Sequence, residues 1–538
     1  RRQLHAAVAG WYEQAHAADL APVYPILAHH WQAAEVPAKA APYAALAGTQ
    51  ALRHGAYQEA VDFLTAALAQ DGPPATPAAR RRQGSWECQL GEAWNGLGRQ
   101  DLSRGHLERA VALLGWPVPT TRNRRRALIG QVGRQVGHRL RPGGPRLVAL
   151  AERAARQEAA TAYQRLIQIA VLANDRPTAL HALLCGLNLA ETAGPSSVLA
   201  QLYSAIGVIL GFLRLPALAG YYGRRAQRLL RRFPDPLTRI RVGMTGTIVD
   251  VQRGRLAPAQ AHLHPAYRLA VQIGDERSQR ETAFLLEWIL HRTGHFRQVQ
   301  AFHQTILERA WQSTDLQTET YLLALQIQCL LHLGAGAAAT ALLQQIPALL
   351  PAVTGPVEKS LLYSSLALGQ LYEGTAAAAV PAAATAWRML GTAAPTSPLQ
   401  LDILSTCAEV YLAGWAAGTL ARPAAARTVT AICRALGRYS QVFAPGRPAY
   451  YRYRGTAAWL AGHPLRARWA WQRSLAAARR LDMRYDAALA HYEIGRHATG
   501  DARPVHLARA RGILAGLGAT GDLARLAAVL AKPRPGRP

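Results

Sequence analysis

Apolar positions in this chain group into helical stretches, and between residues 200 and 380 the grouping repeats every forty residues. One residue opens the turn of each repeat, at intervals of 40: Arg214, Gly254, Gly294, Gly334 and Gly374. Small or apolar residues follow each turn at two fixed distances. Five residues on stand Ala219, Ala259, Val299, Ala339 and Ala379, and twelve on stand Ala226, Ala266, Ile306, Ile346 and Ala386. A fixed period of about 20 to 50 residues is typical of a solenoid.

The small residues indicate where the two helices of a repeat pack closely, because Ala and Gly let two backbones approach to the short end of the usual distance. Each helix pair then buries its apolar face on its neighbours. We therefore predict an all-α fold, a tetratricopeptide-like right-handed superhelical solenoid of helix hairpins. The same pattern predicts earlier hairpins over residues 42–53 with 57–69, and over 86–97 with 102–114.

The spacing divides the chain into five parts. Residues 1–119 hold N-terminal helices and the first hairpins, residues 120–195 an irregular helical connection with one hairpin, and residues 196–390 the regular array. Turn glycines then become less evenly spaced, so we expect residues 391–531 to be further hairpins that end in a cap. Residues 438–448 are expected to be a connection. The tail 532–538 is proline-rich and basic, and we expect it to be disordered.

The formal charge of +29 comes from 61 basic and 32 acidic residues, and all but three of the basic ones are arginine. Such an excess can indicate a nucleic-acid partner. The arginines are spread along the chain, however, with only short runs such as residues 80–82 and 122–126. We favour ordinary surface arginines and do not expect nucleic acid as a partner. A nucleic-acid-binding solenoid remains the alternative function.

Five cysteines stand far apart on expected helices, without the spacing of a zinc site: Cys88, Cys185, Cys329, Cys407 and Cys433. Buried reduced thiols and a cytoplasmic protein are the expectation. Residues 321–357 carry no charged side chain, but Gly334 and Gly336 divide them into pieces too short to span a membrane, so we expect a hairpin there and no membrane partner.

Catalytic and nucleotide-binding motifs are missing from the sequence. A phosphate loop needs a lysine after a glycine, and none of the three lysines follows one. Gly334-Ala335-Gly336 lacks the third glycine of a dinucleotide fingerprint and falls on a repeat turn. His29 and His30 are adjacent on an expected helix and do not face each other. We therefore assign no catalytic residue, no cofactor and no metal.

The candidate binding surface follows from the period, because the first helix of each repeat lines the concave face of such a solenoid. In the usual tetratricopeptide frame, the polar and aromatic positions on that face are Arg241, Glu281, Trp288, Arg292, Tyr321, Gln328, His332 and Tyr372. Arginine and aromatic side chains are frequent anchors of protein interfaces. We predict that a protein, a peptide or a small effector binds there. For Trp288 and Tyr372, as for Phe212, simple packing between helices is an alternative of at least equal weight.

Several residues carry a resemblance to known families. Gly48, Gly55, Tyr57, Ala60 and Ala67 match the tetratricopeptide pattern. Residues 30–34 (His-Trp-Gln-Ala-Ala) with 47–52, and residues 173–175 (Ala-Asn-Asp) with 187–195, resemble the repeat region of large bacterial signalling ATPases. In that family a class III adenylate or guanylate cyclase domain and an AAA-type ATPase precede a long helical arm. The resemblance covers only the arm, and the period of 40 departs from the usual 34.

The resemblance implies a function for this chain, which begins at Arg1 rather than methionine. We expect it to be the C-terminal, non-catalytic arm of such an ATPase, with the ATPase or cyclase region in cis. The arm would bind its partner or effector and bias the ATPase between two states.

Overall fold

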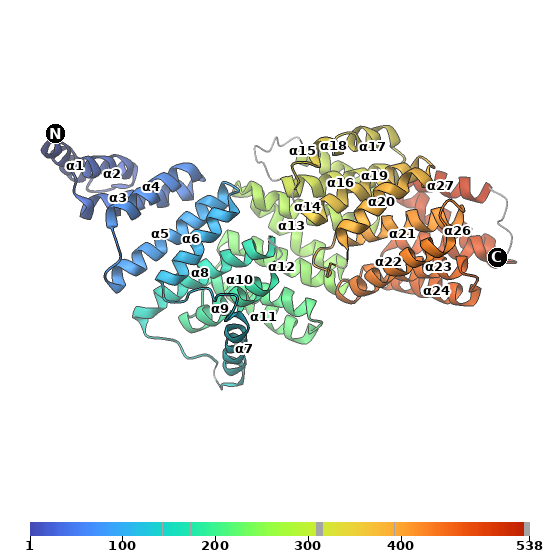
Figure 1. The fold of residues 1–538 in the computed structure, drawn as a ribbon, viewed down its shortest axis with the longest axis horizontal. Coiled ribbons are helices and arrows are strands. Elements are labelled where there is room, and N and C mark those ends of the chain that lie inside the picture. Colours follow the sequence, from blue (N-terminus) through green and yellow to red (C-terminus); the bar gives the residue numbers. More distant parts are fainter. Residues whose placement is uncertain (143, 173–174, 308–315, 354, 392, 532–538) are drawn as a thin grey trace. The chain divides into compact units, whose positions relative to one another are not determined.

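A computed structural model describes residues 1–142, 144–172, 175–307, 316–353, 355–391 and 393–531. Within these ranges the chain is all-α, without a strand, and consecutive helices pack in pairs (Figure 1). This confirms the predicted tetratricopeptide-like class of stacked helix hairpins. The expected disordered tail 532–538, and Ala173 and Asn174 of the family resemblance, lie outside the described residues.

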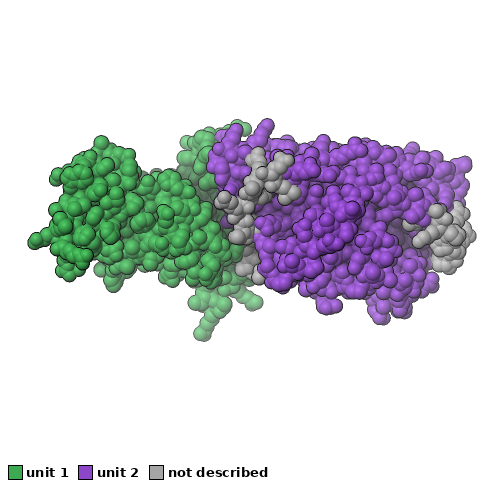
Figure 2. All heavy atoms as spheres, turned by 90° about the horizontal axis from the view of Figure 1, so that it is seen from above, with its two compact units in different colours: residues 1–206, 224–238 green, residues 207–223, 239–538 purple. Residues whose placement is uncertain are grey.

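The chain forms two compact units, which Figure 2 shows in two colours. Unit 1 comprises residues 1–206 and 224–238, and unit 2 comprises residues 207–223 and 239–538. Helices α10 (Ser197–Phe212), α11 (Pro216–Arg232) and α12 (Pro236–Arg253) contribute residues to both. The limits of the five predicted parts of the chain stay predictions.

Unit 1 begins with the helices that precede the regular array. A short 3-10 turn, Ala21–Val23, follows the first helix. The α-helices are α1 (Arg2–Ala15), α2 (Tyr24–Ala33), α3 (Pro37–Arg53), α4 (Tyr57–Asp71), α5 (Pro77–Gly96), α6 (Gln100–Leu113), α7 (Arg124–Leu140), α8 (Leu150–Leu172) and α9 (Arg176–Ala193). Three of the hairpins in this unit are α3 with α4, α5 with α6, and α8 with α9, and α7 packs against α9.

Unit 2 continues the array to the end of the described chain. Its helices after α12 are α13 (Leu256–Gln272), α14 (Glu276–Thr293), α15 (Phe296–Leu307), α16 (Leu316–His332), α17 (Gly336–Leu343), α18 (Ile346–Leu349), α19 (Pro356–Tyr372), α20 (Ala376–Leu390), α21 (Gln400–Ala416), α22 (Arg422–Val442), α23 (Gly446–Leu460), α24 (Pro464–Arg480), α25 (Arg484–His497), α26 (Ala502–Leu517) and α27 (Thr520–Ala531).

The turn residues of the forty-residue array lie where the period predicts. Each follows the first helix of a hairpin and has a positive φ, from +59° at Arg214 to +85° at Gly294 and Gly374. A left-handed backbone crowds a Cβ atom, so glycine fits these turns with least strain. The side chains five residues after each turn are between 0 and 2% exposed, and those twelve residues after are between 0 and 3% exposed. Both small-residue positions are therefore buried contacts.

Unit 2 folds back on itself, so that its early turns lie against segments near its C-terminal end. Three pairs of residues mark the contact: Gly254 with Leu481, Gly294 with Leu517, and Gly334 with Thr520. The hydroxyl of Thr520 donates to the carbonyl of Leu333 at 2.5 Å. Helix α14 also contacts α25, and α16 contacts α27. The first helices of the early hairpins thus face the chain's own later helices.

Several helix limits differ from the sequence prediction because proline does not end these helices. Helix α3 begins at Pro37 and continues through Pro42, where the sequence predicted its start. Pro37 is at the first helical position, where proline loses no helical hydrogen bond. The predicted connection 438–448 is also shorter, because α22 runs to Val442 and α23 begins at Gly446.

The thiols and the hydropathy of the helices complete the description. All five cysteines are free; Cys88 is partly exposed and the other four are buried. In the described ranges, no helix combines the length and the hydropathy that crossing a membrane requires.

Candidate functional site

The eight predicted inner-face residues lie on the first helices of four hairpins, α12, α14, α16 and α19. Arg241 on α12 is half-buried. Glu281 accepts a hydrogen bond from its neighbour Arg277 at 3.0 Å on the same helix. Tyr321 donates to the Glu358 carboxylate, and Gln328 is buried. The other four gather around two buried carboxylates.

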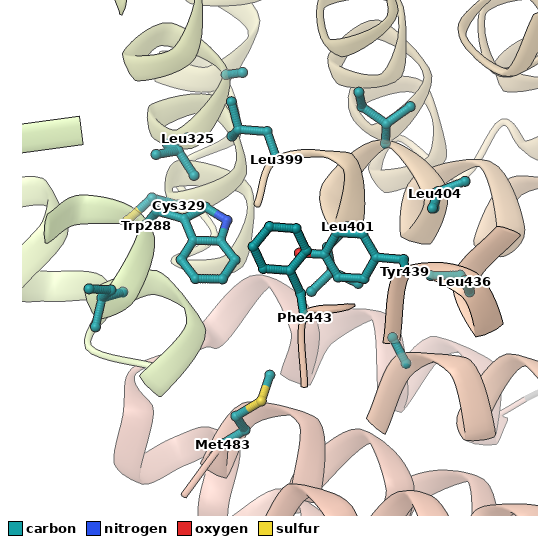
Figure 3. Close-up of a cluster of buried hydrophobic side chains, with 14 of the residues drawn as sticks. Trp288, Leu325, Cys329, Leu399, Leu401, Leu404, Leu436, Tyr439, Phe443 and Met483 are labelled. Carbon is teal, nitrogen blue, oxygen red and sulfur yellow. The ribbon is translucent and has the colours of Figure 1, made fainter. Parts of the chain in front are cut away.

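Trp288 and Arg292 of α14 share the carboxylate of Asp402 on α21. The indole Nε1 of Trp288 donates to Oδ2 at 3.2 Å, and Nη2 of Arg292 donates to Oδ1 at 2.7 Å. Trp288 has no exposed surface, and the Asp402 side chain is 1% exposed. Figure 3 shows Trp288 in the same apolar cluster as Tyr439 and Phe443, whose ring centroids lie 5.1 Å apart. Trp288 therefore joins the ion pair to an aromatic cluster.

His332 of α16 and Tyr372 of α19 share the carboxylate of Asp522 on α27. Nδ1 of His332 lies 2.8 Å from Oδ2, and the Tyr372 hydroxyl donates to Oδ1 at 2.7 Å. The hydroxyl of Tyr485 on α25 approaches the same His332 nitrogen at 3.2 Å. Arg525, also on α27, lies over the Tyr372 ring at 4.1 Å and donates to Glu409 at 2.7 Å. Four helices thus meet at one histidine and one aspartate.

A second histidine, His291, connects the two carboxylates. Nη2 of Arg292 lies 2.7 Å from Nδ1 of His291, and the ring of His291 lies 5.3 Å from that of His332. We call the connected set the inner polar cluster. Its members are Trp288, His291, Arg292, His332, Tyr372, Asp402, Tyr485 and Asp522.

The two aspartates respond differently to their surroundings. Burial raises the pKa of Asp402, and the nearby Arg292 only partly offsets this. At Asp522 burial acts in the same direction, but His332, Arg525 and the Tyr372 hydroxyl together hold the pKa below its usual range. Burial also lowers the pKa of His291, assisted by Arg292 and His332. Arg525 and the two neighbours His332 and Tyr372 therefore favour the charged form of Asp522.

The inner polar cluster is built from contacts between side-chain donors and two carboxylates of the chain itself. Cationic and hydroxyl donors from the early hairpins converge on acids supplied by the later helices. No three His, Cys, Asp or Glu side chains of the described residues are placed to hold a metal ion. The donors that hold Asp522 come from separate hairpins, so their convergence depends on how unit 2 folds back.

The sequence period located half of the inner polar cluster. It identified Trp288, Arg292, His332 and Tyr372. It missed His291 within the array, and Asp402, Asp522 and Tyr485 on helices beyond the array. One signal was present for Asp402, since it is an isolated acid in the otherwise uncharged run 400–408 of an apolar helix. Such an acid requires a partner when buried.

Comparisons with known proteins do not show a family for this chain. No protein-family model matches the sequence, and no curated protein matches it either. Among solved structures, a similar one is the APC/C hetero-tetramer Cut9–Hcn1, with 13% identity, 89% of this chain and 96% of that chain covered, and a TM-score of 0.30.

Two further structures show the same kind of distant similarity. Naa15/Naa10 bound to HypK-THB has 13% identity, covers 94% of this chain and 92% of that chain, and gives a TM-score of 0.22. A circular tandem repeat protein has 12% identity, covers 99% and 100%, and gives 0.16. At these scores the similarity carries no argument about function, and the fold class rests on the helix pairing itself.

Proposed function

We propose that this chain is a protein-interaction repeat scaffold whose inner face recognises an acidic segment of a partner or an acidic effector. The observation that carries the proposal is the inner polar cluster. Arg292, His332 and Tyr372 of the array are held by carboxylates of the chain's own later helices. Asp402 and Asp522 would thus act as ligands that the chain itself supplies. An acidic partner would offer the same carboxylate group.

Helix α27 is the part of this closure that a partner would displace. It is the last described helix; it packs on α26 and α16, and side chains of Asp522 and Arg525 join it to Tyr372 of α19 and Glu409 of α21. Releasing α27 removes Asp522 and leaves His332 and Tyr372 free to bind another acid. A partner that binds only the released form shifts the population toward it, by at most its difference in affinity for the two forms.

In its larger setting, we propose that the chain is the sensor arm of a cytoplasmic bacterial signalling ATPase, such as an adenylate or guanylate cyclase, with the ATPase region in cis. The support is the resemblance of residues 30–34 with 47–52 to the repeat region of those proteins. The release of α27 would be the movement that such an arm transmits. Sequencing the coding region upstream of Arg1 tests this part: a phosphate loop and cyclase aspartates are expected, and their absence would limit the proposal to the scaffold.

Selection of random twelve-residue peptides against the full chain and against Asp522→Asn tests the scaffold. The substitution removes the charge that holds α27, so acidic peptides should bind the variant more tightly than the parent. His332→Gln with Tyr372→Phe should then abolish that binding, while Glu281→Gln on the exposed side of α14 should not. Peptides that bind regardless of His332 and Tyr372, or that carry no acidic residue, would show that the inner face is not the binding surface.

A further inference from the structure

Unit 1 contains a cavity of about 300 Å³ between α7, α8 and α9. It lies in the irregular part of the chain, where α7 packs on α9 outside the hairpin pattern. About half of its wall is polar. The lining includes Trp116, Gln131, Arg134, His138, Arg156, Asn188 and Thr192.

Asn188 presents an unused acceptor in this cavity. Its residue is 5% exposed, and its Nδ2 donates to the Gln131 carbonyl at 3.0 Å and to Gln131 Oε1 at 2.8 Å. Because both of these partners are acceptors, the orientation of the Asn188 amide is fixed by its contacts. Oδ1 is buried and accepts no hydrogen bond from any described residue. A buried acceptor without a donor is costly, so this atom indicates a missing donor.

Two arginines make the same cavity cationic. Nη1 of Arg156 donates to Thr192 Oγ1 at 2.8 Å, Nη2 reaches the exposed Glu152 at 3.5 Å, and the guanidinium lies 5.9 Å from the centre of the Trp116 ring. Its Nε is buried and has no partner within the described ranges. Arg134 forms no ion pair with a described carboxylate.

The nearby acid does not neutralise the cavity, because its oxygens are already used. Glu191 accepts from Gln135 at 3.0 Å and from Tyr203 at 2.8 Å, lies 2.7 Å from His138 Nδ1, and pairs with Arg139. Burial, with Arg139, Arg134 and Arg141, lowers the pKa of His138. Among the described residues, the polar groups that remain available in the cavity are thus the exposed guanidinium of Arg134, the Nε of Arg156 and the Oδ1 of Asn188.

We propose that this cavity binds a small organic oxyanion, a carboxylate or a phosphate monoester, whose flat ring carries a hydrogen-bond donor. Arg134 and Arg156 would hold the oxyanion, Asn188 Oδ1 would accept from the donor, and Trp116 would cover the ring. The volume is at the small end for ligand sites, about 300 to 1,000 Å³. The proposal does not depend on the inner polar cluster, which lies in unit 2.

Isothermal titration of the full chain with four compounds tests the proposal. The compounds are 4-aminobenzoate, benzoate, 4-aminophenyl phosphate and phenyl phosphate, which separate the two oxyanions and the presence or absence of the donor. We expect at least one amino compound to bind, and its counterpart without the amine to bind about tenfold more weakly, as loss of a hydrogen bond to a buried group requires. Whichever oxyanion binds identifies the head group.

Two variants locate the binding. Arg134→Gln should weaken it about tenfold, because a charge-assisted contact is lost, and Arg125→Gln on an exposed position of the same helix should leave it unchanged. An equal loss in both variants would mean attraction to the basic surface and would overturn the site. Binding by none of the four compounds at millimolar concentration would also overturn it, leaving water as the partner of Asn188. Equal binding with and without the amine would exclude Asn188 as a contact.

Discussion

The buried charges are the residues that most distinguish unit 2 from a simple apolar stack. Asp402 and Arg292 form an ion pair in which the two side chains are 1% and 12% exposed. Taking such charges out of water is costly, and only close pairing with further hydrogen bonds offsets the cost. The indole of Trp288 supplies one of those bonds. The ion pair therefore indicates that α14 and α21 must be held in this arrangement. It does not indicate that the pair adds stability.

Asp402→Asn should strongly destabilise the contact between α14 and α21, because it leaves Arg292 buried without its counter-ion. Breaking such a pair typically costs about 3–5 kcal/mol. The control is Glu281→Gln, whose partner Arg277 is well exposed, and which should cost about 0–1 kcal/mol. Hydrogen exchange of α14 and α21 measures both. Equal effects of the two substitutions would mean that Asp402 is already neutral in the folded chain.

A pair of histidines should make unit 2 sensitive to acid. Nδ1 of His491 lies 2.9 Å from Nδ1 of His506, and Arg479 approaches its other nitrogen at 3.3 Å. Burial, with His506, Arg479 and Arg509, lowers the pKa of His491 to about 4. The unfolded value is about 6.5, so the unfolded chain binds more protons between these limits. Stability should therefore be full above about pH 6.5 and fall as the pH drops toward 4.

Denaturant midpoints from pH 7 to pH 4 check this prediction. His491→Gln should reduce the slope of stability against pH by about one proton, and His463→Gln, at an exposed position, should leave the slope as in the parent. A slope that His491→Gln does not change would show that other groups cause the acid sensitivity.

At the scale of helices and turns, the sequence predicted most of what the structure shows. The turn glycines and the small residues after them recur because each hairpin repeats the same local geometry, and local geometry is encoded in a few consecutive residues. Helix starts were less predictable, since Pro42 lies inside α3 and Pro381 inside α20. The pairing of Asp522 with His332, 190 residues apart, has no local signal at all.

Gly334→Ala should loosen the C-terminal helix, whereas Gly418→Ala should not. The two glycines have nearly the same φ, +75° and +72°, so the strain of a left-handed alanine, about 1–2 kcal/mol, is common to both. A Cβ at Gly334 would lie 2.6 Å from Thr520 Oγ1 and 3.1 Å from the Gly521 nitrogen, but at Gly418 it would meet nothing within 4 Å. Only the first substitution pushes α27 away from α16.

Hydrogen exchange over residues 520–528 is the measurement for this pair of variants. Faster exchange in Gly334→Ala alone is expected, and it would also show that α27 can be released while the rest of unit 2 stays folded. Faster exchange in both variants would instead attribute the effect to the strained turns.

At the scale of the whole molecule, the excess of arginine is the main feature that the fold does not explain. The charge is +29, and several arginines are committed to internal contacts, such as Arg292 with Asp402 and Arg525 with Glu409. The rest are distributed over many helices. The sequence could predict the total but not this division, because which arginines are paired depends on contacts between distant helices.

The dispersed charge predicts weak and sequence-independent binding to nucleic acid. Phosphate contacts of this kind release counter-ions, so a protein that makes six to ten of them loses about 10³–10⁵ in affinity between about 50 and 200 mM salt. Fluorescence anisotropy with two duplexes of unrelated sequence should give the same affinity for both at low salt and a steep loss for both as salt rises. A large net positive charge attracts any polyanion in this way, so heparin should compete with equal efficiency against either duplex. Tight binding of one duplex that persists at the higher salt, and that heparin does not displace, would instead require base-specific contacts and would favour a nucleic-acid-binding solenoid over the protein-interaction scaffold.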